Sequence, residues 1–351
     1  MRFFFELSLE DLKSWLKEQD EKEFHARQIF EWVYQKGVLA WEGMTNLSKD
    51  LRGKLASSFR LSGLKCLKVT ESNDLETFKF LWQLHDGKLV ESVLICSKDR
   101  RTVCVSSQVG CPAKCAFCAS GKEGFFRNLS SAEIIEQIVQ INVWLKEKDE
   151  RVCHVVYMGM GEPLKNYTAV VESIRKISHP DFLNISQRRI TVSTVGIVDG
   201  IEQLANEDLK VNLVLSLHAP NQRIRQKIIP YARKYPLEDI LEAMDEYASK
   251  TKRDITFEYT LLAGINDHPD HALELGHLLK GKQCTVNLIP YNPVIGLKLK
   301  RPEKKTIKEF RSVLFGLKIV NTCRYTKGDD IAAACGQLAM QEKNNPTLNV
   351  I

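Results

Sequence analysis

Three cysteines of this chain lie close together in a short segment. Cys111, Cys115 and Cys118 are spaced C-x-x-x-C-x-x-C, and thiolates are common ligands of zinc and of iron–sulfur clusters. Structural zinc sites and four-iron clusters usually take four protein ligands. Three local thiolates therefore predict a metal centre with one position left open for chemistry.

The same spacing has a second interpretation, because offsets of four and seven also place three small apolar side chains on one face of a buried helix. The residues beside the first cysteine argue against a helix. Gly110 precedes Cys111, and Pro112 disfavours a helical conformation at the residue before it. The pattern favours a loop whose thiols converge on a metal.

The chain has ten cysteines in total. Cys104 lies seven residues before Cys111. Cys335 lies in a small-residue segment, Gly328 to Gly336, which leaves room for a substrate to approach. From these residues alone, a reactive and a structural role for Cys335 are equally open. The remaining five are predicted to be buried thiols: Cys66, Cys96, Cys153, Cys284 and Cys323.

A glycine-rich loop, Gly159-Met-Gly-Glu-Pro163, follows one of the apolar runs. Gly159 and Gly161 allow the backbone to approach a ligand closely, and Glu162 places a carboxylate in the middle of the loop. A carboxylate beside exposed backbone groups suits an ammonium ligand. The alternative is a turn with a solvated glutamate. The loop is not a dinucleotide-binding fingerprint, because the third glycine is absent.

Other polar residues also follow apolar runs. Ser193 and Ser216 each end one, and His218 comes two residues after Ser216. Asn292 lies between Tyr291 and a proline. A histidine in this position is commonly a hydrogen-bonded core residue, and an asparagine before proline is commonly a turn former. These residues gain significance as ligands by occurring together with the cysteine loop.

The elements that would position these residues alternate along the chain. The predicted strands are Val90 to Ile95, Thr102 to Ser106, Val152 to Met158, Arg189 to Thr194, Val211 to Ser216, Thr256 to Leu261 and Thr285 to Ile289. The predicted helices are Ser131 to Lys146, Thr168 to Ile177, Gly200 to Asn206, Pro236 to Ser249, His268 to Leu279 and Glu303 to Leu314. This alternation indicates a parallel β/α sheet, flat or curled into a barrel. Because functional residues of such sheets collect at the carboxyl ends of the strands, the polar loops are expected to meet at one ligand site.

The first 85 residues read instead as a small helical unit. Leu9 to Gln19 and Phe24 to Gln35 have helix-spaced apolar residues, and Ser48 is placed to cap a third helix that contains Leu51 and Leu55. Through residue 60 the unit has ten acidic and ten basic residues. Its charge therefore gives no sign of nucleic-acid binding, and its aromatic residues are expected in its core.

The whole chain has 351 residues, 27% charged and 44% hydrophobic, which is typical of globular proteins. No run of 18 apolar residues occurs, and the start of the sequence does not resemble a signal peptide, so a soluble, cytoplasmic protein without a membrane span is expected. The net charge of +6 is concentrated: Lys298 to Lys327 holds ten basic and two acidic residues. A second run, Arg223 to Lys234, has no acidic residue. These two basic segments favour a polyanionic partner, with ordinary solvated helix faces as the alternative.

Together these motifs resemble the RlmN/Cfr family of radical S-adenosylmethionine RNA methyltransferases, and most closely the RlmN members. The cysteine loop has the spacing of the radical S-adenosylmethionine superfamily, with Phe117 before the last thiol. The resemblance extends from about Arg27 to Leu338 and includes these strings: His25-Ala-Arg-Gln-Ile-Phe-Glu-Trp32, Cys104-Val-Ser-Ser-Gln-Val-Gly-Cys111, Gly159-Met-Gly-Glu-Pro-Leu164, Ser216-Leu-His-Ala-Pro-Asn221 and Gly328-Asp-Asp-Ile-Ala-Ala-Ala-Cys-Gly-Gln337. It implies a partial (β/α)6 barrel of the TIM type over residues 86–340, a helical RNA-recognition domain over 1–85 and a C-terminal tail over 341–351.

The resemblance also implies the cofactors. Cys111, Cys115 and Cys118 would hold a [4Fe-4S] cluster whose open iron binds the amino and carboxylate groups of S-adenosylmethionine. Two molecules of S-adenosylmethionine would be used in each turnover. The residues implied to bind them are Gly161, Glu162, Ser193, Ser216, Leu217, His218 and Asn292.

The implied chemistry needs two further thiols, because the C2 carbon of adenine is not nucleophilic. Cys335 would become S-methylcysteine, a radical formed from the second cofactor molecule would take a hydrogen from that methyl group, and the resulting carbon would add to the ring. Cys104 would then release the product by forming a transient disulfide with Cys335. Glu91 matches the position of the family's proton acceptor.

The implied substrates are an adenosine of 23S rRNA, methylated at C2, and adenosine 37 of tRNA. An electron donor such as flavodoxin or ferredoxin and a monomeric state are also expected. Methylation at C8, as by the Cfr members, is the nearest alternative, since both branches share every motif quoted. A metal-stabilised RNA-binding protein without catalysis and an iron–sulfur electron carrier are the alternatives from other classes.

Overall fold

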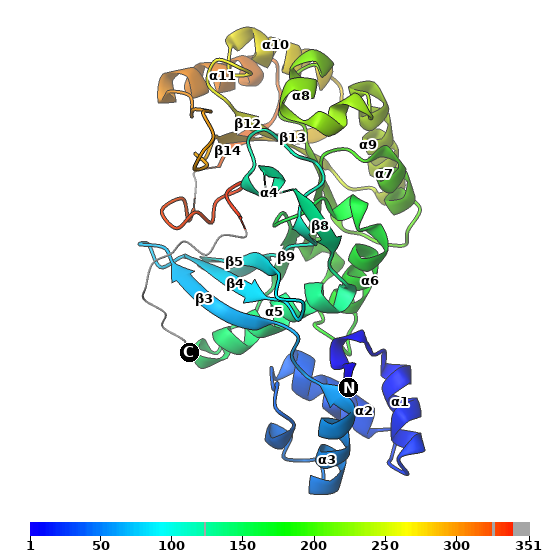
Figure 1. Ribbon diagram of the computed structural model, residues 1–351. Helices are drawn as coiled ribbons and strands as arrows, with labels where there is room; N and C mark the ends of the chain where they lie inside the picture. The colour runs from blue at the N-terminus through cyan, green and yellow to red at the C-terminus, as the bar shows by residue number, and fades with distance from the viewer. Residues whose placement is uncertain (123, 325–326, 340–351) are drawn as a thin grey trace.

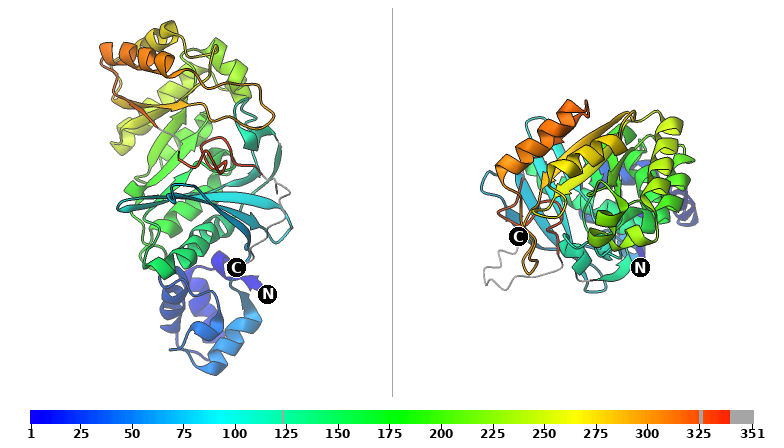
Figure 2. Two further views of the ribbon diagram at one scale, coloured as in Figure 1. Left: turned by 90° about the vertical axis from the view of Figure 1, so that its left-hand side faces the viewer. Right: turned by 90° about the horizontal axis from the view of Figure 1, so that it is seen from above.

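Figure 1 shows a computed structural model of the chain, which describes residues 1–122, 124–324 and 327–339. The expected C-terminal tail, 341–351, lies outside the described residues. The helical unit at the N-terminus lies at one end of the molecule, below a large curved sheet with helices along its outer side (Figures 1 and 2). None of the helices in the described ranges is long and apolar enough to cross a membrane.

The N-terminal unit contains the three predicted helices. Its elements are β1 (Arg2–Phe3), η1 (Phe4–Glu6), α1 (Leu9–Glu18), α2 (His25–Phe30), the π-helical η2 (Glu31–Gln35), η3 (Trp41–Gly43), α3 (Lys49–Ser58) and β2 (Phe59–Arg60). The Ser48 side chain accepts a hydrogen bond from the Leu51 N–H at 3.1 Å and so begins α3 where the sequence predicts it.

The main sheet has ten strands in the order β14-β13-β12-β11-β10-β9-β6-β5-β4-β3. From β6 to β14 neighbouring strands are parallel, and from β3 to β6 they are antiparallel. The strands are β3 (Lys65–Glu71), β4 (Thr77–Gln83), β5 (Leu89–Ser97), β6 (Arg100–Cys104), β9 (His154–Tyr157), β10 (Ile190–Thr194), β11 (Asn212–Ser216), β12 (Ile255–Leu261), β13 (Cys284–Pro290) and β14 (Asn321–Cys323). A small separate hairpin joins β7 (Gln108–Gly110) to β8 (Phe125–Asn128).

Helices connect the parallel strands. They are α4 (Ala119–Lys122), α5 (Ser131–Leu145), α6 (Tyr167–Ser178), α7 (Val198–Ala205), α8 (Gln222–Ile228), α9 (Leu237–Thr251), α10 (Pro269–Leu278) and α11 (Lys304–Gly316). Short 3-10 helices are η4 (Lys146–Lys148), η5 (Pro163–Lys165), η6 (Gln187–Arg189) and η7 (Pro230–Arg233). Every predicted strand and helix of this region is present, with ends shifted by at most two residues. The six β/α units from β6 to β14 form the expected partial barrel.

The sheet begins earlier than the expected domain boundary at residue 85. The strands β3 and β4 belong to the sheet, so the helical unit ends near residue 63. The turn between β4 and β5 contains Asp86-Gly87, with Gly87 at a φ of +79°. An Asp-Gly pair between two apolar runs is a hairpin signal. The polar β3, at the edge of the sheet and mostly exposed, lacks the apolar pattern that identifies a strand.

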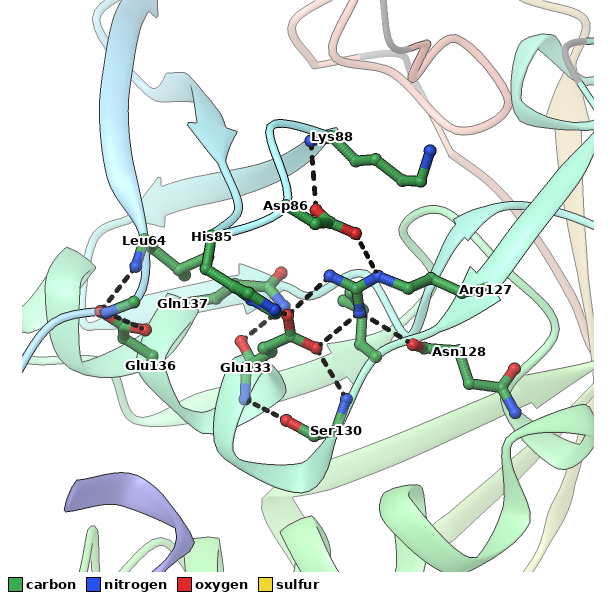
Figure 3. A network of polar contacts seen from close by, with 12 residues as sticks. Leu64, His85, Asp86, Lys88, Arg127, Asn128, Ser130, Glu133, Glu136 and Gln137 are labelled. Atoms are coloured by element: carbon green, nitrogen blue, oxygen red, sulfur yellow. Dashed lines mark hydrogen bonds and ion pairs between the residues drawn. The ribbon is translucent and has the colours of Figure 1, made fainter. Parts of the chain in front are cut away.

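A polar network fixes the helical unit to the barrel (Figure 3). Glu136 of α5 is fully buried and accepts hydrogen bonds from the N–H groups of Gly63 at 2.8 Å and Leu64 at 3.0 Å. Nearby, Arg127 of β8 binds Glu133 through two hydrogen bonds of 2.8 and 2.9 Å. The linker that leaves the helical unit is therefore held by α5 itself.

Candidate active site

A cavity opens at the carboxyl ends of the parallel strands, where the sequence predicts a ligand site. The side chains and loops that line it are Cys111, Ala113, Cys115, Phe117, Cys118, Tyr157, Met158, Gly159, Gly161, Glu162, Ser193, Thr194, Val195, Ser216, His218, Glu258, Thr260, Ile289, Tyr291, Asn292, Cys335 and Gly336. Nearly all the residues predicted from the sequence to bind a ligand therefore face one space.

The three-cysteine segment is a loop, as Gly110 and Pro112 predict, and α4 begins only after it. Neighbouring elements hold its backbone. The Cys111 N–H donates to the Gly124 oxygen at 2.9 Å, and the Ala116 N–H donates to the Ile228 oxygen at 2.9 Å. The first bond joins the loop to the β7–β8 hairpin and the second joins it to α8. All three thiols face the cavity.

Burial raises the pKa of each of these thiols, to about 12 for Cys111 and in the same direction for Cys115 and Cys118. Charge on Cys111 or Cys118 also raises the pKa of Cys115. Burial alone therefore disfavours the thiolate form of these cysteines. A positively charged metal centre would favour the thiolate form.

The glycine loop has the close packing that the sequence predicts. Gly161 has a φ of +111°, and a Cβ at this position would lie 2.7 Å from both the Gln108 Cβ and the Ser107 Oγ. Glu162 is buried, not solvated: its two carboxylate oxygens accept hydrogen bonds from the N–H groups of Leu164 at 3.0 Å and Val195 at 2.8 Å. Burial raises the pKa of Glu162 to about 7, so a cationic ligand in the cavity would favour its ionised form.

The two serines lie on the neighbouring strands β10 and β11, and the histidine follows the end of β11. The Oγ atoms of Ser193 and Ser216 are 3.2 Å apart. His218 is buried, and burial lowers its pKa to about 3, so the ring is neutral. Its Nδ1 accepts a hydrogen bond from the Thr260 N–H at 2.9 Å, which places the ring hydrogen on Nε2. Leu217 differs from its neighbours, because its side chain is fully buried in the core and does not line the cavity.

The segment that contains Cys335 runs as a loop above the antiparallel strands (Figure 2, left), and Cys335 and Gly336 line the cavity. The Asn292 side chain donates to the Cys335 oxygen at 3.2 Å, and the Ala119 N–H donates to the Gly336 oxygen at 2.7 Å. Lys79 of β4 donates to the Ala332 oxygen at 3.2 Å. The segment is therefore held between the three-cysteine loop and the antiparallel strands, and it brings Cys335 into the same cavity as the three cysteines.

Cys104 and Glu91 are not among the residues that line the cavity. Cys104, at the end of β6, is buried. Burial raises the pKa of its thiol most, and the charge of Cys335 raises it further. Glu91 of β5 accepts a hydrogen bond from the Ala339 N–H at 2.8 Å and lies 3.1 Å from the Lys79 Nζ.

Glu91 and Cys104 lie on the same face of the sheet, because Val93 pairs directly with Cys104 and Glu91 comes two residues before Val93. Such diagonal neighbours have their Cα atoms about 7–8 Å apart. The structure thus places Glu91, Cys104 and Cys335 in one region.

Two charged residues of the site were missed in the sequence. Glu258 lies in the strand β12 and lines the cavity. A charged residue inside a predicted strand was the sequence signal that could have identified it as a site residue. Arg225 was expected to contact a polyanion with the rest of its basic segment. That expectation is wrong, because Arg225 is fully buried and donates to the backbone oxygens of Leu217 at 3.1 Å and Val195 at 2.6 Å.

The two basic segments are otherwise divided between surface and site. Exposed basic residues of the first are Lys298, Lys300, Arg301, Lys304, Lys305, Lys308, Lys318 and Arg324, and those of the second are Arg223, Lys227, Arg233 and Lys234. Arg301 forms an ion pair of 3.1 Å with Asp329 and also contacts Asn292. Some of the positive charge therefore stabilises the cavity wall, and the rest faces solvent.

Sequence models of two families match this chain. One, described as the Radical SAM superfamily, matches residues 105–276, which include most of the cavity loops. The other, described as the ribosomal RNA large subunit methyltransferase N-terminal domain, matches residues 4–61 and covers the helical unit. Fold and site together define a radical S-adenosylmethionine enzyme.

Similar proteins narrow the class. A relative from Protochlamydia amoebophila, named "Probable dual-specificity RNA methyltransferase RlmN 2", is 76% identical over 96% of this chain and 94% of its own length. One from Bacillus subtilis, with the RlmN name, is 45% identical over 98% of this chain and 94% of its own. A crystal structure of a radical SAM methyltransferase from Sphaerobacter thermophilus is 40% identical, with a TM-score of 0.94, and covers 97% of this chain and 100% of its own. The chain belongs to the RlmN family of radical S-adenosylmethionine RNA methyltransferases.

Membership in this superfamily implies a [4Fe-4S] cluster and S-adenosylmethionine, and the donor set fits. Three thiols of one loop face the cavity. Three thiolates leave one iron of a [4Fe-4S] cluster without a protein ligand, which is the open position that this class of enzyme requires.

Proposed function

We propose that this protein methylates C2 of an adenosine in 23S rRNA and of adenosine 37 in tRNA. The observation that carries the proposal is that Cys335 faces the same cavity as Cys111, Cys115 and Cys118. A thiol beside the cluster loop is in the position required to pass a carbon atom from cofactor to substrate. An RNA-binding protein or an electron carrier has no need of this thiol.

The cofactors would be held by the residues described above. The three cysteines would bind the cluster, and Gly161, Glu162 and the loops that contain Ser193, Ser216 and Asn292 would surround S-adenosylmethionine. Leu217 would contribute through its backbone. The His218 Nε2–H would donate a hydrogen bond toward the cavity. When bound, the reduced cluster supplies the electron that cleaves S-adenosylmethionine to a carbon-centred radical.

The thiols outside the cluster loop would carry the methyl group. Cys335 would accept a methyl group from a first molecule of S-adenosylmethionine, and a second molecule would be used to activate that methyl group, so two would be needed per turnover. After the carbon has joined the adenine ring, Cys104 would attack the Cys335 sulfur, release the RNA and leave a disulfide. Glu91 would be the final acceptor of the ring proton, since it lies on the same face of the sheet as Cys104.

RNA would approach the open side of the cavity, and the target adenosine would have to leave its stack to reach Cys335. The exposed lysines between Lys298 and Lys318 and the exposed cations between Arg223 and Lys234 would contact phosphates. The helical unit would recognise RNA shape. We also propose that the protein is a cytoplasmic monomer and takes electrons from a flavodoxin or ferredoxin. The reducing environment of the cytoplasm would restore both thiols after each turnover.

A test is to reconstitute the protein anaerobically with iron and sulfide and to supply S-adenosylmethionine, a reductant and either 23S rRNA or tRNA. Mass spectrometry of the digested RNA should show 2-methyladenosine, together with 5′-deoxyadenosine in solution. Finding 8-methyladenosine would correct the position of methylation. Absence of 5′-deoxyadenosine from a cluster-loaded protein would refute the radical reaction.

The role of Cys104 can be tested separately. In the C104A variant the thiol that releases the product is missing, so RNA should accumulate covalently attached to Cys335 and survive denaturing electrophoresis. The C284A variant, which removes a cysteine at the far end of β13, should release methylated RNA as the wild type does. If C104A also releases free methylated RNA, the assignment of Cys104 is wrong.

A further inference from the structure

Glu258 lies in the cavity at a position that the proposed reaction leaves without a role. It is in β12 and pairs with Ser216 of β11. Side chains alternate along a strand, so Glu258 and Thr260 both face the cavity, whereas Phe257 and Tyr259 are buried on the other side. A carboxylate in this position requires a partner or a function, because burial of an unpaired charge is costly.

One carboxylate oxygen of Glu258 lacks a hydrogen-bond partner. Oε1 is buried and accepts no hydrogen bond from any described residue. The Arg324 Nη1 lies 3.6 Å from it, an ion-pair distance that is too long for a hydrogen bond. Glu162 is different, because both of its oxygens already accept backbone N–H groups. Glu258 is thus the carboxylate of the cavity with a free acceptor position.

The charge of this carboxylate acts on both reactive thiols. Cys335 lines the same cavity as Glu258. Desolvation in the cavity raises the pKa of the Cys335 thiol most, and the charge of Glu258 raises it next. The same charge also acts on Cys104, though less strongly. Burial raises the pKa of Glu258, and Arg324 opposes that effect.

The first step of the proposed reaction needs a base. A thiol attacks a methyl group as the thiolate, and the surroundings of Cys335 disfavour its thiolate form. His218 cannot accept the proton, because its Nδ1 already accepts the Thr260 N–H and its Nε2 carries the hydrogen. Backbone N–H groups donate to both oxygens of Glu162 and stabilise its ionised form, which makes it a weaker base than a carboxylate with an oxygen that accepts no hydrogen bond.

We propose that Glu258 is the base that accepts the thiol proton of Cys335, and that Arg324 positions the Glu258 carboxylate; this inference rests on the proposed function. The proton moves from the Cys335 sulfur to the carboxylate. The sulfur lone pair forms the new bond to the methyl carbon while the bond from that carbon to the sulfonium breaks. The electrons of the broken bond remain on the departing thioether, S-adenosylhomocysteine, so no oxidant or reductant is needed.

The test measures methylation of Cys335 without RNA or reductant, so that radical chemistry does not contribute. Holoenzyme is mixed with S-adenosylmethionine, and intact mass spectrometry follows the gain of one methylene, assigned to Cys335 by peptide mapping. We expect E258Q to slow this step by about 100-fold, a typical contribution of a positioned base. E258D, which keeps a carboxylate, should be slowed less.

Controls separate this role from a structural one. E136Q makes the same change in a buried carboxylate outside the cavity and should be methylated at the wild-type rate. Iron and sulfide content, thermal unfolding and S-adenosylmethionine affinity by equilibrium dialysis should be unchanged in E258Q. If E258Q does not fold, R324Q changes a half-exposed side chain instead and should also slow methylation.

Three results would overturn the inference. E258Q could methylate Cys335 at the wild-type rate, or it could lose affinity for S-adenosylmethionine in parallel with rate, which would make Glu258 a cofactor ligand. If E258Q does not fold, methylation of Cys335 at the wild-type rate in R324Q would also contradict the inference. A wild-type enzyme that never methylates Cys335 would refute the proposed function itself. This result differs from failure of the Glu258 inference, in which the wild type is methylated and E258Q is methylated equally fast.

Discussion

Gly161 allows the glycine loop to pack closely against its neighbours because it has no Cβ. Gly161 has the left-handed φ of +111°, which other residues rarely adopt, and there is no room for a Cβ between Gln108 and Ser107. The peptide that follows carries Glu162, whose N–H donates to the Gln108 side chain at 2.8 Å. Any shift of Gly161 therefore moves a carboxylate that lines the site.

The G161A variant tests this dependence. The added methyl group would overlap Gln108 and Ser107 in a strained backbone, so the loop must move and S-adenosylmethionine affinity should fall at least about tenfold, or about 1.4 kcal/mol. Equilibrium dialysis with cluster-loaded protein measures the change. Gly87 offers a control, because it also has a positive φ of +79° but no atom lies within 4 Å of the point that a Cβ would occupy. G87A should bind the cofactor normally, and equal losses in both variants would contradict the argument.

At the scale of elements, α8 holds together the loops that follow three strands. Arg225 of this helix donates to the oxygens of Val195, Leu217 and Ser216, and the end of α8 accepts the N–H of Ala116 in the three-cysteine loop. Burial lowers the pKa of Arg225 to about 10, and the charge of Cys115 opposes this effect. A seven-residue helix thus connects the cofactor loops with the cluster loop.

Replacing Arg225 should disconnect these loops. R225M keeps most of the buried volume but leaves three backbone oxygens without their donor, so the free energy of unfolding of the apoprotein should fall by about 1–3 kcal/mol. Denaturant unfolding measures this loss, and iron content after reconstitution should fall with it. R223M changes an exposed arginine of the same helix and should alter neither. Unchanged stability and iron content in R225M would refute this role of α8.

The pattern of apolar residues along the chain predicts some elements of this fold and leaves others undetermined. Strands such as β11 and β12 are apolar runs inside a parallel sheet, and their ends fall where the sequence places them. Arg225 is misassigned because a basic run gives no information on which cation points inward. The Asn292 side chain donates to the Cys335 oxygen, and the Ala119 N–H donates to the oxygen of the neighbouring Gly336. Even the nearer partner, Asn292, is 43 residues from Cys335 in sequence. Periodicity carries no signal for such contacts, so only the family resemblance indicated the importance of this thiol.

At the scale of the whole molecule, the helical unit and the barrel share a continuous core. Phe30 and Tyr34 pack on Phe182 with ring centroids 5.0 and 4.8 Å apart, and their aromatic character therefore reflects packing, as predicted from the sequence. The cavity lies at the carboxyl ends of the strands, whereas Phe182 lies between α6 and β10, at the amino ends. Changes at the junction should therefore leave the chemistry of the cavity intact and alter only how RNA is presented to it.

The E136A variant tests that separation. Removing the buried carboxylate leaves the N–H groups of Gly63 and Leu64 without an acceptor, so the free energy of unfolding should fall by about 1–3 kcal/mol and proteases should cut the linker faster. Methylation of Cys335 without RNA should proceed at the wild-type rate, whereas methylation of rRNA and tRNA should be weaker, because the helical unit would be less firmly placed. E147A, an exposed glutamate of η4, is the control. If E136A slowed both reactions equally, the helical unit would be part of the scaffold of the cavity and not a separate determinant of RNA presentation.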